Sequence, residues 1–246
     1  MAQRVKLEIA ANALESALAA QAGGADRIEL CENLGEGGCT PSYGTLALAR
    51  ERLSIPLYVL IRPRGGDFVY SPAEWEAMRR DVALCVRLGC DGVVIGALTA
   101  GGEIDTEGCA SLVAAAGPLG VTFHRAFDSV RDPQRALEQI IALGCERVLT
   151  SGQAAGAPQG AASIAAARAQ AAGRLSVMAG AGLTVDNVAE LVRRTGVGEV
   201  HASAKAFQAG QGSSDLPGLE GGYWRTDADQ VRALRARLDE IAANQA

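Results

Sequence analysis

The sequence predicts a single-domain α/β protein, a closed (β/α)8 barrel of the TIM type, on three observations. Short runs rich in Val, Ile and Leu alternate with amphipathic stretches, and eight such pairs can be counted. The segments that lead into the even-numbered runs resemble one another, which indicates a repeated βαβα unit, although chance similarity is an alternative explanation. Eight units within 246 residues favour a closed barrel over an open sheet.

The elements follow from the apolar runs and the residues that punctuate them. Strands are expected at residues 5–10, 26–31, 56–62, 92–97, 120–126, 146–151, 175–180 and 198–203. A helix is expected after each strand. The clearest begins at Ser71-Pro72-Ala73-Glu74, which combines an N-cap, a first-turn proline and an early acid, and ends at Gly89. Residues 132–144 repeat this punctuation. The domain is expected to span residues 1–246, with a loop at about 205–226 before the last helix.

Composition excludes several classes of protein. Lys and Arg number 23 against 28 Asp and Glu, a net charge of −5, which argues against a nucleic-acid partner. No apolar run approaches the ~18 residues of a membrane span and no signal peptide is recognisable, so we expect a cytoplasmic protein with no membrane partner. The six cysteines are scattered, so free thiols are expected. A homo-oligomer is left open.

Alternation along the strands predicts which side chains face the barrel interior. The face toward the helices should be apolar, so Leu7 and Ile9 point outward while Glu8 and Ala10 point inward. Carried around the barrel, this rule gives an upper layer of Ala10, Cys31, Arg62, Gly96, His124, Ser151, Gly180 and Ser203. The layer below contains Glu8, Glu29, Leu60, Val94, Thr122, Leu149, Met178 and His201.

Four ionisable residues are the candidate catalytic groups. A barrel interior is normally apolar, so the inward positions of Glu8, Glu29 and His201 require partners. Their strands become neighbours when the barrel closes, which predicts one acid/base or metal-binding cluster; a structural salt-bridge network with Lys6 and Arg27 is the alternative. The fourth candidate, His124, lies near another strand end, where an ordinary core histidine is the alternative.

Glycine and arginine residues at the strand ends indicate an anion site. Two guanidiniums and a glycine pair follow the third strand in the segment from Arg62 to Asp67, and we expect Arg62 and Arg64 to hold a carboxylate or phosphate. A solvated loop is the alternative. Turns after the later strands supply further hydroxyl and backbone N–H donors. The remaining members of this candidate site are Ser151, Gly180, Gly182 and Ser203.

Two cysteines are candidate metal ligands. Cys31 is expected at the end of the second strand and Cys39 in the loop that follows, and soft thiolates suit Cu(I). The other cysteines are expected to have packing roles: Cys85, Cys90, Cys109 and Cys145.

Five motifs resemble one family. They are GGADRIELC at 23–31, IRPRGGDF at 61–68, TFHRAFD at 122–128, LTSG at 149–152 and HASA at 201–204, and together they resemble the CutC copper-homeostasis family. The resemblance implies a single TIM barrel, a cytoplasmic location and copper binding or trafficking. Two positions depart from the family pattern: Ala10 stands where the family has the first cysteine of its Cu(I) pair, and Ala181 where it has a glycine. A methyl group at Ala181 restricts close approach of a ligand to the backbone.

Two functions follow from these observations. The resemblance implies a copper-homeostasis protein that binds copper ion. The polar barrel mouth favours an enzyme, an isomerase or lyase acting on a small phosphorylated or carboxylated metabolite. The expected partner is therefore either copper, as Cu(I), or a small anionic ligand, and the substrate and reaction stay open. A purely structural role explains the ionisable groups at the strand ends less well.

Overall fold

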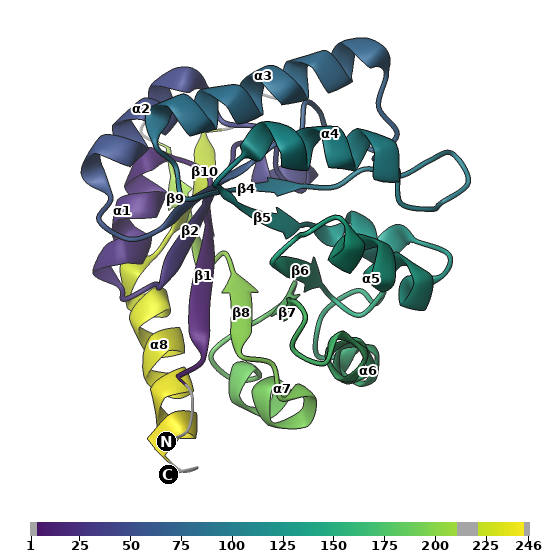
Figure 1. Cartoon of the computed structure of the whole chain (residues 1–246). Helices are drawn as coiled ribbons and strands as arrows, with labels where there is room; N and C mark the ends of the chain where they lie inside the picture. The colour runs from purple at the N-terminus through teal and green to yellow at the C-terminus, as the bar shows by residue number, and fades with distance from the viewer. Residues whose placement is uncertain (1–3, 211–220, 244–246) are drawn as a thin grey trace.

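The computed structural model describes residues 4–210 and 221–243, and it confirms the fold class. Eight parallel strands close into a barrel in chain order, with the last strand paired to the first (Figure 1). The strands are β1 (Lys6–Ala11), β2 (Arg27–Leu30), β3 (Leu57–Leu60), β4 (Gly92–Ile95), β5 (Gly120–Phe123), β6 (Arg147–Thr150), β7 (Ser176–Gly180) and β8 (Glu199–Ala202).

Helices surround the barrel and cover its outer face (Figure 1). They are α1 (Leu14–Ala22), α2 (Tyr43–Arg52), α3 (Pro72–Leu88), α4 (Thr106–Ala116), α5 (Pro133–Ala142), α6 (Ala161–Ala171), α7 (Val188–Thr195) and α8 (Ala228–Ala243), with short 3-10 helices η1 (Leu34–Glu36) and η2 (Arg125–Ser129). The expected start of α3 is confirmed, because Ser71 and Glu74 form a reciprocal capping box. Gly89 ends α3 in the left-handed region at φ +69°. No helix in the described ranges is long and apolar enough to cross a bilayer.

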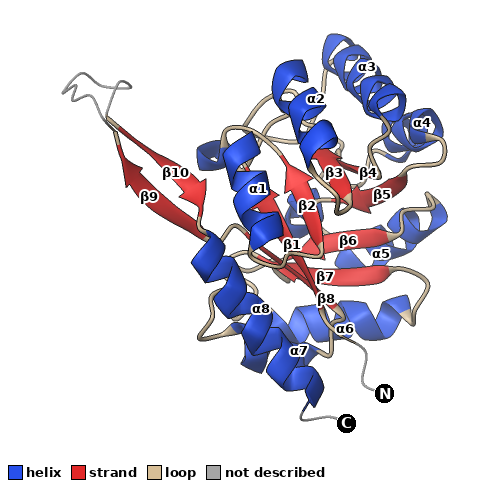
Figure 2. Cartoon of the chain, turned by 90° about the vertical axis from the view of Figure 1, so that its left-hand side faces the viewer, coloured by secondary structure: helices blue, strands red, loops and turns tan. Residues whose placement is uncertain are grey.

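The segment expected to be a loop at 205–226 contains a hairpin. Strands β9 (Lys205–Ala209) and β10 (Gly222–Thr226) pair antiparallel and extend away from the barrel (Figure 2). Phe207 lies opposite Trp224, and their rings meet edge to face with centroids 5.5 Å apart. Such cross-strand aromatic pairs stabilise a ribbon of two strands, which accounts for the difference from the expectation. The rest of that segment, 211–220, lies outside the described residues.

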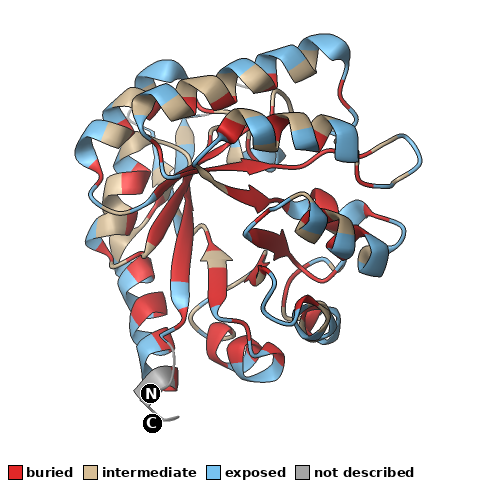
Figure 3. Ribbon diagram, in the orientation of Figure 1, coloured by how far each residue is buried: buried red, intermediate tan, exposed pale blue. Residues whose placement is uncertain are grey.

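The predicted alternation of side chains is confirmed. Leu7 and Ile9 are fully buried in the outer core, between the strands and the helices, while Tyr58, Leu60 and Val94 form a smaller cluster inside the barrel. Figure 3 shows the consequence, since the strands are buried almost throughout their length whereas the helices alternate between buried and exposed positions. Each strand therefore offers one parity of side chains to the barrel interior.

Charged groups, not branched apolar ones, occupy much of the lower barrel. Arg27 binds Glu8 on one side and Glu199 on the other, with 2.6 Å from Nη2 to the Glu199 carboxylate. Arg147 binds the same Glu199 at 2.7 Å, and the ring of Tyr58 lies 5.1 Å and 5.4 Å from the two guanidinium carbons. The salt-bridge network that the sequence offered as an alternative was expected to contain Arg27, and it does. Its inclusion of Lys6 is wrong, because Lys6 is exposed at the start of β1.

Candidate functional site

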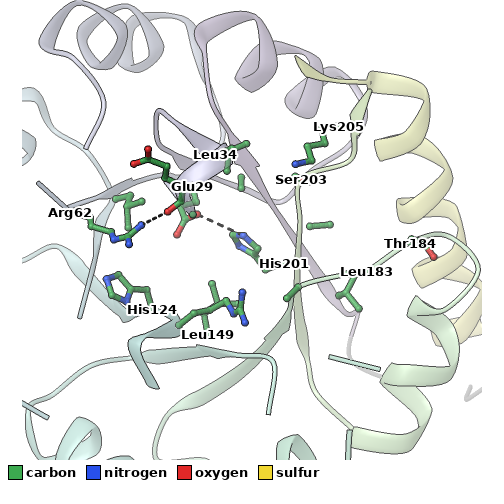
Figure 4. Close-up of a pocket in the computed structure, with 18 of the residues that line it drawn as sticks. Glu29, Leu34, Arg62, His124, Leu149, Leu183, Thr184, His201, Ser203 and Lys205 are labelled. Atoms are coloured by element: carbon green, nitrogen blue, oxygen red, sulfur yellow. Dashed lines mark hydrogen bonds and ion pairs between the residues drawn. The ribbon is translucent and has the colours of Figure 1, made fainter. Parts of the chain in front are cut away.

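A pocket of about 570 Å³ opens at the carboxyl ends of the strands (Figure 4). Its floor comes from inward-facing strand residues and its rim from the loops that follow β2, β3, β7 and β8. The residues used below line it: Glu29, Arg62, Phe68, His124, Gly182, His201, Ser203 and Lys205. The pocket volume falls within the range of roughly 300–1,000 Å³ that is typical of small-molecule sites.

Three candidate catalytic residues meet at the bottom of this pocket, where Glu29 and His201 line it and the buried Glu8 lies behind His201. Glu8 on β1 binds His201 on β8, with 2.7 Å between the carboxylate and Nδ1. The other imidazole nitrogen, Nε2, faces Glu29 on β2 at 3.7 Å. The β1–β8 pairing that closes the barrel places Glu8 beside His201, and β2 lies on the other side of β1. His201 is thus held between two carboxylates, one oriented by Arg27 and one that lines the pocket.

The two carboxyl groups have opposite pKa shifts. Burial raises the pKa of Glu8, but the charges of Arg27 and His201 outweigh burial and bring it to about 2. Burial also raises the pKa of Glu29, and the Glu8 charge adds to that effect against the opposing His201, so the Glu29 pKa lies at about 7. Burial lowers the pKa of His201, but the carboxylates of Glu29 and Glu8 raise it above its ordinary value. Glu8 therefore stays ionised at neutral pH, whereas the Glu29 carboxyl gains and loses its proton near pH 7.

His124 and Arg62 lie on the opposite wall. His124 accepts a hydrogen bond from the Ala126 backbone N–H at Nδ1, 3.1 Å away. Burial, reinforced by the Arg62 charge, lowers the His124 pKa to about 3, so this imidazole is neutral. Arg62 donates to the backbone carbonyls of Glu36, Gly38 and Gly66, each at 2.8 Å.

The turns after β7 and β8 form a third side of the pocket. Gly182 and Ser203 line it, together with Lys205, which sequence reasoning missed. Ala181 adopts a positive φ of +81° despite its methyl group, a conformation that usually favours glycine. Gly180 lies beneath this turn and makes room for its neighbours, because a Cβ there would sit 2.6 Å from Leu149 and 3.2 Å from His201.

Besides Gly180, two residues of the expected anion site do not line the pocket. Arg64 binds Glu74 of α3 at 2.6 Å and Asp67 of the preceding loop at 3.0 Å, and it does not line the pocket. Ser151 is buried and hydrogen-bonds Asp128 at 2.9 Å. Asp128 also accepts from the Ser151 backbone N–H, so it fixes the turn after β6. The structure therefore does not bring Arg64 and Ser151 into the lining of this pocket.

Neither candidate thiol lines the pocket. All six cysteines are free, as expected. Cys31 is fully buried in the inner cluster, and burial, with the nearby Glu29 and Cys39, raises its pKa well above the ordinary value. Cys39 is half-buried on a turn whose backbone pairs with Glu32. Gly38 lies over Cys31, since a Cβ at Gly38 would sit 3.6 Å from its sulfur.

Within the described ranges, one group of three or more potential ligand residues is compact enough for a single metal ion. It consists of Glu8, Glu29 and His201, whose ligand atoms lie within 4.8 Å of one another. This oxygen and nitrogen set differs from the thiolate set that Cu(I) prefers. Both oxygens of Glu8 already bind Arg27 and His201, so a metal would compete with these partners.

Sequence reasoning missed two charged residues of the interior, Arg147 and Glu199. The alternation of side chains along the strands could have identified both. Arg147 lies two residues before the inward-facing Leu149, and Glu199 lies two residues before the inward-facing His201. Through Arg27, Glu199 helps to fix Glu8, so both missed residues support the floor of the pocket.

The fold and the pocket define a TIM-barrel protein with a polar pocket at the carboxyl ends of its strands. A family model described as the CutC family matches residues 5–206. A CutC family protein of Xylella fastidiosa strain 9a5c is 59% identical over 240 residues, covering 96% of this chain and 90% of that protein. One of Chromobacterium violaceum is 54% identical over 244 residues, covering 95% and 98%. The chain belongs to the CutC family.

Solved structures agree with this assignment. The crystal structure of CutC from Streptococcus agalactiae, a protein assigned provisionally to copper homeostasis, is 35% identical with a TM-score of 0.78, covering 81% of this chain and 98% of that one. Thiamine phosphate pyrophosphorylase from Pyrococcus furiosus, at 16% identity and a TM-score of 0.61, shares the fold.

Proposed function

We propose that this protein is an enzyme that transfers a proton on a small carboxylated or phosphorylated metabolite, as an isomerase or lyase does. The observation that carries the proposal is the arrangement of Glu8, His201 and Glu29 at the floor of a ligand-sized pocket. A buried carboxylate with a pKa of about 7 is suited to general acid–base catalysis at neutral pH.

The three residues have different roles in this proposal. Glu8 stays ionised and accepts the Nδ1–H of His201, which fixes the tautomer and the orientation of the ring. Nε2 then faces Glu29 at 3.7 Å, within ion-pair distance. When this pair is deprotonated, it accepts a proton from a carbon of the substrate. The same pair returns the proton to a second position to complete an isomerisation.

The cationic rim supports an anionic substrate. Lys205 lines the pocket beside Ser203, and the turn at Gly182 precedes α7. Arg62 adds a charge on the opposite wall. A phosphate or carboxylate at this rim would leave the rest of a small molecule within reach of Glu29 and His201.

The direct test is hydrogen exchange. The protein is incubated in D2O with a panel of phosphorylated sugars, 2-oxo acids and 2-hydroxy acids, and the loss of each C–H signal is followed by proton NMR. We expect enzyme-dependent exchange for at least one phosphorylated or carboxylated compound. Absence of exchange across the whole panel would count against the proposal.

Inorganic phosphate is expected to raise the melting temperature. An anion bound at the rim stabilises the folded state by mass action, by about 2.7 kcal/mol at 100 times its Kd. Lys205→Gln should weaken this rise, whereas Arg64→Gln should leave it unchanged, because Arg64 lies outside the pocket. Differential scanning fluorimetry at constant ionic strength measures both effects. An equal rise in wild type and Lys205→Gln would remove Lys205 from the anion site.

Copper binding is the second candidate function. Membership of the CutC family favours it, as does the short separation between the Cys31 sulfur and the turn that carries Cys39. The buried Cys31 thiol must lose its proton to bind Cu(I), and Ala10 supplies no second thiolate, so we expect weak binding.

A titration of the reduced protein with Cu(I) in the presence of a competing chelator tests this candidate. We expect Cys31→Ser to lose the binding, since Cys31 is the one cysteine placed at a strand end beside the mouth. Cys109→Ser is the matched control, because Cys109 is buried against the outer core on α4. Unchanged affinity and stoichiometry in Cys31→Ser would show that the site lies elsewhere.

A further inference from the structure

Two buried N–H groups in the pocket wall have no hydrogen-bond partner among the described residues. They are Nε of Arg62 and Nε2 of His124. Both side chains line the pocket, and Figure 4 shows them on the same side, across the pocket from His201. A buried donor without an acceptor is unfavourable, so two such donors in one wall of a ligand pocket indicate an acceptor that arrives with the ligand.

Arg62 cannot turn to satisfy its free donor elsewhere. Its two terminal nitrogens donate to the carbonyls of Glu36, Gly38 and Gly66, and Nε is the guanidinium nitrogen without a partner. The ring of Phe68 packs 5.0 Å from the guanidinium carbon and holds it from a further side. The direction of the Nε–H bond is therefore set before any ligand binds.

His124 is fixed in the same way. Its Nδ1 accepts the Ala126 N–H, so the ring proton resides on Nε2. Its ring packs over Gly96, where any Cβ would overlap it, and lies 5.0 Å from the ring of Phe68. Phe68 thus contacts both residues, which places a neutral imidazole N–H and a guanidinium N–H in one rigid wall.

We propose that Nε–H of Arg62 and Nε2–H of His124 together bind one carbonyl or carboxylate oxygen of the substrate, adjacent to the carbon that loses its proton. This inference rests on the proposed function and names the substrate class: a small molecule with a C–H bond next to a carbonyl or carboxyl group. The C–H bond breaks, its proton passes to the Glu29–His201 pair, and its electron pair forms a C=C bond. The charge that develops on the substrate oxygen is held by the two donors.

The test compares two probes that differ by a carboxylate. Calorimetric titration of the full chain with 2-phosphoglycolate and with inorganic phosphate measures how much the carboxylate adds to the affinity. Wild type should bind 2-phosphoglycolate at least about tenfold more tightly than phosphate, as expected for an oxygen held by charge-assisted hydrogen bonds.

Two substitutions separate the donor from the structural role of the ring. In His124→Asn the side-chain oxygen can replace Nδ1 as acceptor for the Ala126 N–H but nothing replaces Nε2, so the preference for 2-phosphoglycolate should disappear. In His124→Gln the amide N–H can replace Nε2, so the preference should survive even where the melting temperature falls. Phosphate affinity should stay unchanged in both variants.

Four results would overturn the inference: equal binding of the two probes by wild type, no binding of 2-phosphoglycolate, a preference retained in His124→Asn, or a preference lost in His124→Gln. The proposed function fails by a different measurement, the absence of deuterium exchange. A protein that prefers the carboxylate through His124 but exchanges no proton would have the oxygen site without the catalytic activity.

Discussion

Replacing Glu29 with Gln is expected to reduce deuterium exchange by about 10²- to 10⁴-fold, the usual contribution of a general base, while leaving the fold intact. The amide matches the carboxylate in shape but cannot accept the proton. The Glu29 carboxylate lies 3.7 Å from His201 Nε2, beyond hydrogen-bond distance, so its replacement by an amide removes little from the stability of the barrel. Circular dichroism and proton NMR exchange on the same preparation measure the two effects.

The exchange rate of wild type should also rise as pH increases through about 7. The base is the deprotonated form of the Glu29–His201 pair, and the Glu29 pKa lies at about 7. Glu36→Gln is the matched control, because Glu36 also lines the pocket but lies in η1 and its carboxylate is not part of the cluster. Unchanged exchange in Glu29→Gln would reduce Glu29 to a structural partner of His201.

Replacing Arg27 with Met is expected to destabilise the protein by about 3–5 kcal/mol, the typical loss when a buried ion pair keeps one partner. Arg27 lies between Glu8 and Glu199, and all three side chains are largely withdrawn from solvent. Met fills a similar volume but leaves Glu8 without its main neutralising charge. The free energy of unfolding from urea titration measures the loss.

Arg174→Met is the control for this prediction. Arg174 binds Glu138 at 2.6 Å, but both side chains are about half exposed, and such surface pairs contribute about 0–1 kcal/mol. A similar small loss in Arg27→Met would show that the interior network does not stabilise the barrel. We also expect Arg27→Met to raise the pKa of Glu8, because the Arg27 charge is the largest cause that lowers it.

The sequence alone determined the barrel and the face of each strand. Eight strand–helix units in a chain of this length favour a closed parallel sheet over an open one, and the period of two then assigns Glu8 to the interior because Leu7 and Ile9 must meet the helices. Closure makes β8 a neighbour of β1, so the meeting of Glu8, Glu29 and His201 could also be anticipated. These properties depend on chain order and polarity, which a sequence records.

Only the tertiary structure decided which partner each charged group takes. Arg64 and Arg62 are two residues apart, yet Arg64 binds Glu74 outside the pocket while Arg62 is fixed in its wall by three carbonyls. The sharing of Glu199 between Arg27 and Arg147 depends on distances of a few ångströms across the barrel, and the edge-to-face pair in the β9–β10 hairpin depends on strand register. For each of these groups the sequence offers several possible partners of equal charge or polarity. The length and direction of the side chains and their packing determine which partner is bound, and local periodicity in the sequence does not specify these properties.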